Sequence, residues 1–258
     1  MVDRIAQFQA AKERGERLAV LTAYDYPQAR LLEESGVDVL LVGDSLGMVV
    51  LGYPDTTLVT MEEMEHHTRA VARGVSDGGG RALILADLPF GTIATVDLAV
   101  ANARRLVAAG AQAVKLEGGA DAVPQIAAIR GAGIPVMAHI GMQPQRVRIE
   151  GGYRVKGKTP EAAEGLLHDA HAVEKAGAFG LLLELVVPAV AREITAALKI
   201  PTIGIGAGAD CDGQVLVLHD LVGLFPWFKP KFATQRATVG EEIRRAAAEF
   251  ISGVKKPG

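Results

Sequence analysis

The sequence predicts a (β/α)8 barrel of the α/β class, formed as a single domain over residues 1–258 with an extra helix at its N-terminus. Eight short apolar segments alternate with segments of helical pattern, which is typical of α/β folds. The apolar segments lack the alternation of a half-exposed strand, so we expect parallel strands that are buried on both faces. Eight such units fit the usual size of one barrel. A doubly wound open sheet is the structural alternative.

The eight expected strands are short and are spread along the whole chain. They cover residues 18–22, 37–42, 82–86, 111–116, 134–138, 180–185, 200–205 and 214–218. A glycine marks the end of the preceding helical segment in several cases, for example Gly36, Gly110 and Gly177. Glycine at this place supplies the left-handed residue with which helices often end.

Helix signals support the segments between the strands. Residues 3–14 predict the extra helix that precedes the first strand. Thr60 and Glu63 have the spacing of a capping box, in which each residue bonds the main chain of the other. Thr159 followed by Pro160 is a hydroxyl cap with proline at the first helical position, which predicts a helix that reaches Ala176.

The C-terminal region predicts one more helix. Residues 234–251 are rich in Ala, Glu and Arg, which favours a helix over this whole range. We expect residues 252–258 to be frayed.

The composition limits the class of protein. A net charge of -3 offers no basic surface for nucleic acid. No apolar run approaches the roughly 20 residues that span a bilayer, and the first residues lack a secretory pattern. Cys211 is the only cysteine, which excludes an intramolecular disulfide framework and favours a reducing compartment. We therefore expect a cytoplasmic protein that binds small molecules and neither nucleic acid nor a membrane.

Polar side chains stand where the expected strands end. In a barrel of parallel strands, active sites lie at the carboxyl ends of the strands. Side chains that are far apart in the chain would meet there. The main candidates are Asp44, Ser45, Asp87, Lys115, Glu117, His139 and Glu184.

Asp44, Asp87 and Glu117 are three oxygen donors on consecutive strands. Such hard ligands suit Mg²⁺, and the His and Cys spacing of a zinc site is absent. The sequence therefore predicts a magnesium site formed by these three carboxylates. The structural alternative is that each acid caps a helix or pairs with an arginine.

Glu184 interrupts an apolar segment, which would raise the pKa of its carboxyl group towards the range of a general base. A buried acid that is satisfied by the main chain or by an arginine is the alternative. Lys115 could bind a substrate carboxylate or enolate, form a Schiff base, or only pair with the acids around it. His139 competes as a base or as a donor to a carbonyl oxygen, against the alternative of a histidine satisfied in the core.

The glycine-rich segment 204–208 follows the seventh expected strand. It matches a dinucleotide-binding pattern, but the chain returns to a strand where that pattern requires a helix. Its main-chain amides could hold an anion, or the glycines could serve only to turn the chain tightly.

Five motifs, in order along the chain, resemble the ketopantoate hydroxymethyltransferase family. The motifs are Leu-Val-Gly-Asp-Ser-Leu-Gly-Met at 41–48, Ala-Asp-Leu-Pro-Phe-Gly at 86–91, Val-Lys-Leu-Glu-Gly-Gly at 114–119, Gly-Gly-Tyr-Arg-Val-Lys-Gly at 151–157, and Ile-Gly-Ile-Gly-Ala-Gly at 203–208 with Asp-Gly-Gln-Val-Leu-Val at 212–217. The resemblance covers nearly the entire chain. It implies a barrel enzyme of pantothenate synthesis, in which 5,10-methylenetetrahydrofolate supplies a hydroxymethyl group to 2-oxoisovalerate and 2-dehydropantoate forms.

The resemblance also implies roles for the strand-end residues. It makes Asp44, Asp87 and Glu117 ligands of Mg²⁺, and it makes Glu184 the proton acceptor. Ser45, Asp87 and Lys115 would contact the oxo acid, and we add Asp44 and His139 to this predicted substrate-binding set. Members of the family form homo-oligomers, often decamers, so we expect a homo-oligomer here.

Two other functions fit the residues. The first is a Mg²⁺-dependent lyase or mutase that resembles the phosphoenolpyruvate mutase and isocitrate lyase group, which would cleave a carbon-carbon bond without folate. The second is a barrel without catalytic activity that binds small anions. A scaffold has no need of three acids, a lysine and a buried glutamate at its strand ends, so we rank this function last.

Overall fold

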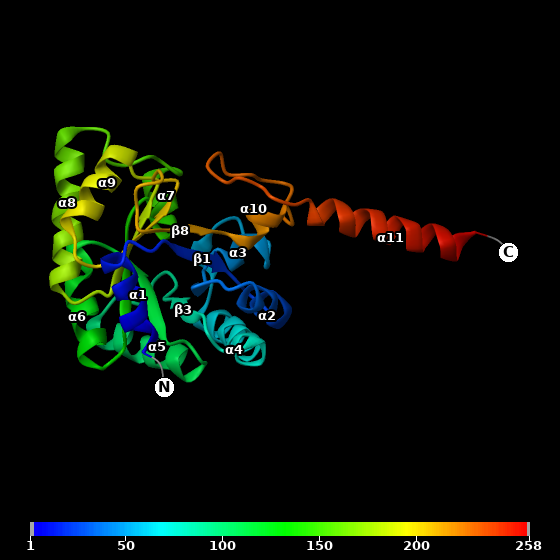
Figure 1. Ribbon diagram of the computed structural model, residues 1–258, viewed down its shortest axis with the longest axis horizontal. Coiled ribbons are helices and arrows are strands. Elements are labelled where there is room, and N and C mark those ends of the chain that lie inside the picture. Colours follow the sequence, from blue (N-terminus) through cyan, green and yellow to red (C-terminus); the bar gives the residue numbers. More distant parts are fainter. Residues whose placement is uncertain (1–2, 257–258) are drawn as a thin grey trace. The chain divides into compact units, whose positions relative to one another are not determined.

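The computed structural model describes residues 3–256 and contains a closed barrel of eight parallel strands in the order β1 to β8 (Figure 1). This confirms the predicted (β/α)8 barrel and excludes the open sheet. The chain divides into two compact units, one up to Val215 and one from Leu216 onwards. The single domain over residues 1–258 stays a prediction.

The strands lie close to their predicted places. They are β1 Leu18–Thr22, β2 Val39–Val42, β3 Leu83–Asp87, β4 Ala113–Glu117, β5 Val136–Gly141, β6 Gly180–Glu184, β7 Thr202–Ile205 and β8 Gly213–Leu216. Four of them, β2, β4, β5 and β7, start two residues later than predicted. In β2, β4 and β5 the preceding helix end uses those residues. The main-chain N–H groups of Val37, Ala111 and Ile134 each donate to a helix carbonyl five residues earlier. These bonds satisfy carbonyls that the helix itself leaves free.

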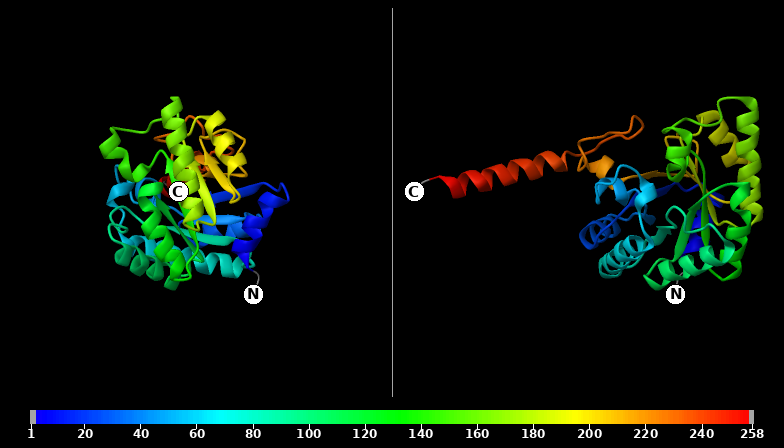
Figure 2. Two further views of the ribbon diagram at one scale, coloured as in Figure 1. Left: turned by 90° about the vertical axis from the view of Figure 1, so that its left-hand side faces the viewer. Right: turned by 180° about the vertical axis from the view of Figure 1, so that it is seen from behind.

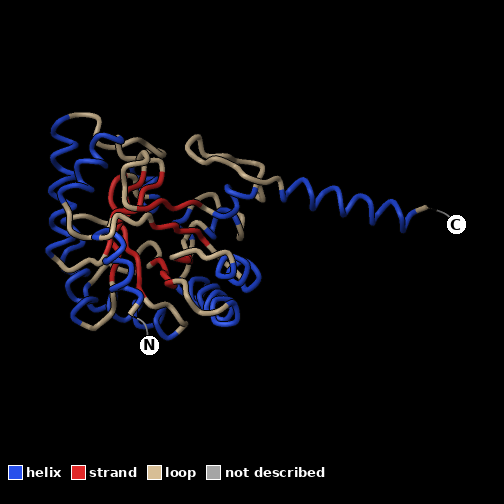
Figure 3. Tube along the Cα trace, viewed as in Figure 1, coloured by secondary structure: helices blue, strands red, loops and turns tan. Residues whose placement is uncertain are grey.

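Helices surround the strands of the first unit, as the secondary-structure colours of Figure 3 show. They are α1 Arg4–Glu13, α2 Tyr26–Glu34, α3 Leu46–Val49, α4 Met61–Gly78, α5 Val96–Ala108, α6 Val123–Gly131, α7 Val147–Glu150, α8 Pro160–Lys175 and α9 Pro188–Ala197, with the short 3-10 helices η1 Thr56–Leu58, η2 Ala120–Ala122 and η3 Pro144–Arg146. The predicted capping box of Thr60 and Glu63 is present at the start of α4, and Thr159 caps α8.

Alternation along the strands separates the barrel interior from its outer surface. On β3, Leu83 and Leu85 belong to the interior cluster, whereas Ile84 and Ala86 pack in the larger cluster that includes the helices. Phe8 of α1 joins the interior cluster, so the extra helix closes the amino end of the barrel. In Figure 2, α1 is the dark blue helix near the N-terminus. The inward positions that follow towards the carboxyl ends are polar, and they carry the candidate site.

The second unit contains α10 Leu218–Val222 and α11 Val239–Lys255. The prediction of a helix from residue 234 is wrong, because Arg236 donates its main-chain N–H to the carbonyl of Leu221 and Gly240 donates to Gly223. These bonds hold the segment before Val239 in a loop. The helix continues to Lys255, so the prediction of a frayed end is wrong up to that residue, and residues 257–258 lie outside the described part. Within residues 3–256, no helix has the length and apolar character needed to span a membrane.

Candidate active site

The barrel brings the predicted site residues together at the carboxyl ends of β2 to β6. In the register of the sheet, Asp87 pairs with Lys115 and Glu117 pairs with His139. Lys115 and Glu117 are two residues apart on β4 and therefore point to the same face, which is the barrel interior. Glu184 ends β6 opposite Gly141. The convergence expected from the strand ends is confirmed.

Asp44 and Asp87 form a buried carboxylate pair. The main-chain N–H of Asp44 donates to Asp87 Oδ2 over 3.0 Å. Burial first, and the Asp87 carboxylate second, raise the pKa of Asp44 to about 7. Burial also raises the pKa of Asp87, against the effect of Lys115. Two acids this close resist ionising together, so the pair holds a proton more strongly than exposed acids do.

Lys115 is the cation of this cluster. Its Nζ lies 3.2 Å from Asp87 Oδ1 and 3.2 Å from His139 Nδ1. Burial lowers the pKa of Lys115, but Asp87, Glu117 and Asp44 raise it by more, so Lys115 stays charged. A charged lysine with donors directed at these groups could also meet a substrate oxygen.

His139 lies between the lysine and the predicted base. Burial lowers the pKa of His139 well below its usual value, so the ring is neutral. An ammonium group has donors only, and therefore we assign Nδ1 of His139 as the acceptor from Lys115 and place the ring proton on Nε2. Nε2 faces Glu184 Oε2 at 3.4 Å. In this tautomer His139 is a donor at the side of Glu184 and is not a base.

Glu184 stands at a point where the main chain is unusually constrained. Leu185 has φ of 47°, the one positive φ of a non-glycine residue among residues 3–256. This conformation costs roughly 1–2 kcal/mol for an L-residue. Main-chain bonds hold it, because Leu185 donates to Ile205 O over 2.9 Å and accepts from Lys156 N over 2.8 Å. Burial raises the pKa of Glu184 to about 8, which suits a general base at neutral pH.

The segment 151–157 is fixed next to this base. Lys156 pairs in parallel with Val186, and the N–H of Val187 donates to the carbonyl of Lys156 over 3.0 Å. Tyr153 of the same segment donates its hydroxyl to Met48 Sδ over 3.8 Å. Burial and the acids of the site raise the pKa of Tyr153. The segment therefore lies beside the site residues of β2 and β6.

Two more residues complete the site. Ser45 Oγ lies 2.8 Å from the hydroxyl of Tyr24. Gln145 of η3 donates its side-chain Nε2 to Asp44 Oδ2 over 2.8 Å and its main-chain N–H to Glu117 Oε2 over 3.0 Å. The sequence did not predict Gln145, because an uncharged amide after a strand carries no chemical signal of its own.

The donor set fits a divalent cation by charge. Asp44, Asp87, Glu117 and Glu184 provide four carboxyl groups against one lysine, and Glu117 Oε1 is buried without a hydrogen-bond partner in the described chain. Burial raises the pKa of Glu117 well above its ordinary value, so a cation bound here would displace protons. In the present rotamers, no group of three or more His, Cys, Asp or Glu side chains within residues 3–256 is arranged to hold a metal ion.

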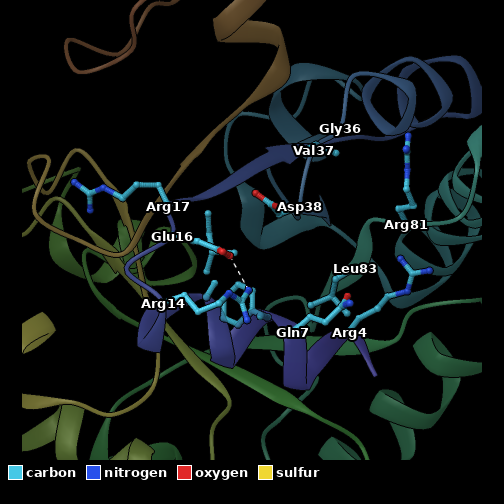
Figure 4. Close-up of a pocket in the computed structure, with 13 residues that line it drawn as sticks. Arg4, Gln7, Arg14, Glu16, Arg17, Gly36, Val37, Asp38, Arg81 and Leu83 are labelled. Atoms are coloured by element: carbon cyan, nitrogen blue, oxygen red, sulfur yellow. Dashed lines mark hydrogen bonds and ion pairs between the residues drawn. The ribbon is translucent and has the colours of Figure 1, made fainter. Parts of the chain in front are cut away.

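A cavity of about 700 Å³ lies at the opposite, amino end of the strands (Figure 4). Four arginines line it, but their guanidinium groups are used in other contacts. Arg4 donates to Ala82 O, and Arg14 pairs with Glu16. Arg17 donates to Ala209 O, and Arg81 pairs with Glu33. The acid cluster at the carboxyl ends is therefore the stronger candidate for chemistry.

Comparison with known proteins identifies the family. Residues 3–257 match the sequence profile described as ketopantoate hydroxymethyltransferase. The chain belongs to the ketopantoate hydroxymethyltransferase family. Relatives that carry the name 3-methyl-2-oxobutanoate hydroxymethyltransferase include those of Clostridium novyi, 52% identical over 99% of this chain and 92% of the relative, and of Moorella thermoacetica, 53% identical over 98% and 93%. The resemblance read from the five motifs is confirmed.

Solved structures of other proteins are similar to this family member in fold. A putative phosphonomutase of Burkholderia cenocepacia matches with a TM-score of 0.69 and 19% identity, over 97% of this chain and 98% of the other. A 2,3-dimethylmalate lyase, described as a PEP mutase/isocitrate lyase superfamily member, matches with a TM-score of 0.64 and 19% identity, over 100% and 90%. At such identities the likeness shows the fold alone.

Proposed function

We propose that this protein transfers a hydroxymethyl group from 5,10-methylenetetrahydrofolate to 2-oxoisovalerate and so forms 2-dehydropantoate for pantothenate synthesis. The observation that carries the proposal is similarity at about half of all positions, over nearly the full chain, to relatives named for this activity. The site supports it, since Glu184, whose side chain is 13% exposed, and the charged Lys115 stand beside three further, buried acids at the barrel mouth.

In this proposal Glu184 accepts the proton from C3 of 2-oxoisovalerate. Burial raises the pKa of Glu184 to about 8, so its carboxylate is basic enough to take a proton from carbon without being fully protonated at neutral pH. His139 Nε2, to which we assign the ring proton, lies 3.4 Å from the same carboxylate. Proton transfer leaves an electron pair that is shared between C3 and the 2-oxo oxygen.

Asp44, Asp87 and Glu117 would hold Mg²⁺, which supplies a Lewis acid for the developing negative charge on the 2-oxo oxygen. Lys115 adds a fixed positive charge to the same region, and Ser45 offers a hydroxyl donor to the substrate carboxylate. C3 then forms a bond to the methylene carbon of the folate, and both bonds from that carbon to the two folate nitrogens, N5 and N10, break. One of these bonds is replaced by the bond to C3 and the other by a bond to a hydroxyl oxygen, and the two nitrogens take up the proton lost from C3 and one proton of water. One water molecule supplies the oxygen of the new hydroxyl group.

Product formation provides the first test. We expect 2-dehydropantoate to form only when both Mg²⁺ and 5,10-methylenetetrahydrofolate are present. Formation of a cleaved oxo acid without folate would instead support a lyase of the isocitrate lyase type.

The role of Glu184 is tested by loss of deuterium from C3 of labelled 2-oxoisovalerate. We expect the Glu184→Gln variant to lose label several orders of magnitude more slowly than the wild type. Glu174→Gln is the matched control, because Glu174 accepts from the N–H groups of Lys199 and Ile200 away from the site. Equal rates in Glu184→Gln and the wild type would remove Glu184 as the base.

The metal role is tested separately. Asp44→Ala should weaken Mg²⁺ binding in titration calorimetry, and unchanged affinity would refute the ligand role.

We further propose that the protein is cytoplasmic and forms a homo-oligomer. The family resemblance suggests that this oligomer is a decamer. Light scattering that finds only the 27.1 kDa chain would contradict this part.

A further inference from the structure

Gln145 has three hydrogen bonds at the centre of the site, although its side chain can neither accept a proton nor carry charge. It lies in η3, on the loop that follows β5, and is 7% exposed. Its Nε2 donates both to Asp44 Oδ2 over 2.8 Å and to Leu88 O over 3.0 Å. Both amide hydrogens are therefore used. The main-chain N–H donates to Glu117 Oε2 over 3.0 Å.

These bonds join three parts of the barrel that are far apart in the chain. Asp44 follows β2, Leu88 follows β3, and Glu117 ends β4. Carboxylates in one buried cluster repel one another, so they spread apart unless donors hold them. An amide provides two donors without adding charge. Gln145 therefore fixes two acids while it leaves the negative charge of the cluster unchanged.

The loop that carries Gln145 is itself anchored at both ends. On one side, the N–H of Met142 donates to Glu184 O over 2.8 Å. On the other side, Arg148 donates to Asp55 Oδ2 over 2.7 Å. Within the loop, Arg146 donates to the carbonyl of Gln143 over 2.8 Å and closes a tight turn. The amide of Gln145 is thus held at a defined place relative to the acids.

We propose that Gln145 is the positioning residue that holds Asp44 and Glu117 in the orientation with which they bind a divalent cation. The inference rests on the proposed function, because it takes the cation from there. It adds a residue that neither the motifs nor the chemistry of the charged groups indicated. Groups that orient metal ligands typically change metal affinity by roughly 10–100-fold when they are removed.

The test is binding of Mn²⁺ to the full chain without substrate, measured by calorimetry and by the electron paramagnetic resonance signal of free Mn²⁺. Gln145→Met keeps the size of the side chain and the main-chain N–H but removes the amide. We expect about 10–100-fold weaker binding than in the wild type. Gln125→Met is the matched control, because within residues 3–256 the Gln125 amide donates to Ile93 O over 3.2 Å and to none of the acids of the site.

The possible outcomes separate the two proposals. Wild-type affinity in a folded Gln145→Met variant would overturn the role of Gln145 and leave the proposed function standing. A wild-type protein that binds no Mn²⁺ would overturn the proposed metal site and, with it, the inference. If Gln145→Met fails to fold, Gln145→Asn decides, because its amide is withdrawn by about 1.5 Å, one carbon-carbon bond. We expect weaker Mn²⁺ binding in that variant too, and unchanged affinity would refute the inference.

Discussion

The contact between Gly141 and Glu184 offers a sharp test of how the main chain positions the base. Gly141 has φ of 95°, and a Cβ atom built on it would lie 2.3 Å from Glu184 O and 2.7 Å from Val186 Cγ2. Non-bonded heavy atoms normally stay about 3.5 Å apart, so Gly141→Ala must push the two strands apart by roughly 1 Å. A displacement of this size at a catalytic group can cost about 10²-fold in rate.

The effect of Gly141→Ala on stability can be separated from its effect on the site. The positive φ alone costs an alanine about 1–2 kcal/mol, and the overpacking adds about 1–3 kcal/mol. Gly133 has φ of 81° and nothing within 4 Å of its added Cβ, so Gly133→Ala has only the first cost. It is the matched control for backbone strain without displacement of Glu184.

The assay is loss of deuterium from C3 of 2-oxoisovalerate, with thermal unfolding followed in parallel. At a temperature where both variants are folded, we expect Gly141→Ala to exchange about 10²-fold more slowly than the wild type. Gly133→Ala should match the wild-type rate. A folded Gly141→Ala variant that exchanges at the wild-type rate would refute the reasoning that this contact positions the base.

Three further predictions concern charge and stability. The exchange rate should rise about tenfold per pH unit in acid and level off at or below about pH 8, because burial raises the pKa of Glu184 to about 8 and a bound cation would lower it; a rise that continues above about pH 9 would point to another base. Lys115→Met should move the levelling point to higher pH, since the lysine charge lowers the pKa of Glu184; an unmoved profile would contradict this. Glu33→Ala should lower the free energy of unfolding in urea by about 2–5 kcal/mol and leave the exchange rate of the folded protein unchanged, because the buried N–H of Ala82 and the partly buried N–H of Arg81 lose their acceptor. Stability equal to the wild type would show that these donors find another partner.

The fold could be predicted because each of its parts is encoded locally. Apolar runs bounded by helix caps and glycines indicate buried parallel strands, and the capping residues Thr60 and Thr159 begin helices where predicted. The start of the last helix was predicted wrongly, because a main-chain bond between residues that are separated in the chain decides it. Arg236 bonds to Leu221, so the last helix starts at Val239. Local helix propensity carries no information about that bond.

The sequence by itself determined which chemical groups meet at the barrel mouth. A parallel barrel gathers the carboxyl ends of its strands, and the spacing of two between Lys115 and Glu117 directs both inward. The acids, the lysine and Glu184 were therefore predictable without coordinates. Their assembly as one buried cluster followed from topology.

The tertiary structure alone decided how these groups are held. Gln145 reaches Asp44 across 101 positions of sequence, and Gly141 makes room for the carbonyl of Glu184 on the neighbouring strand. The proton position that we assign to His139 depends on its distance to Lys115. Hydrogen bonds and close contacts depend on separations of a few tenths of an ångström. Such separations are fixed only when the whole barrel closes.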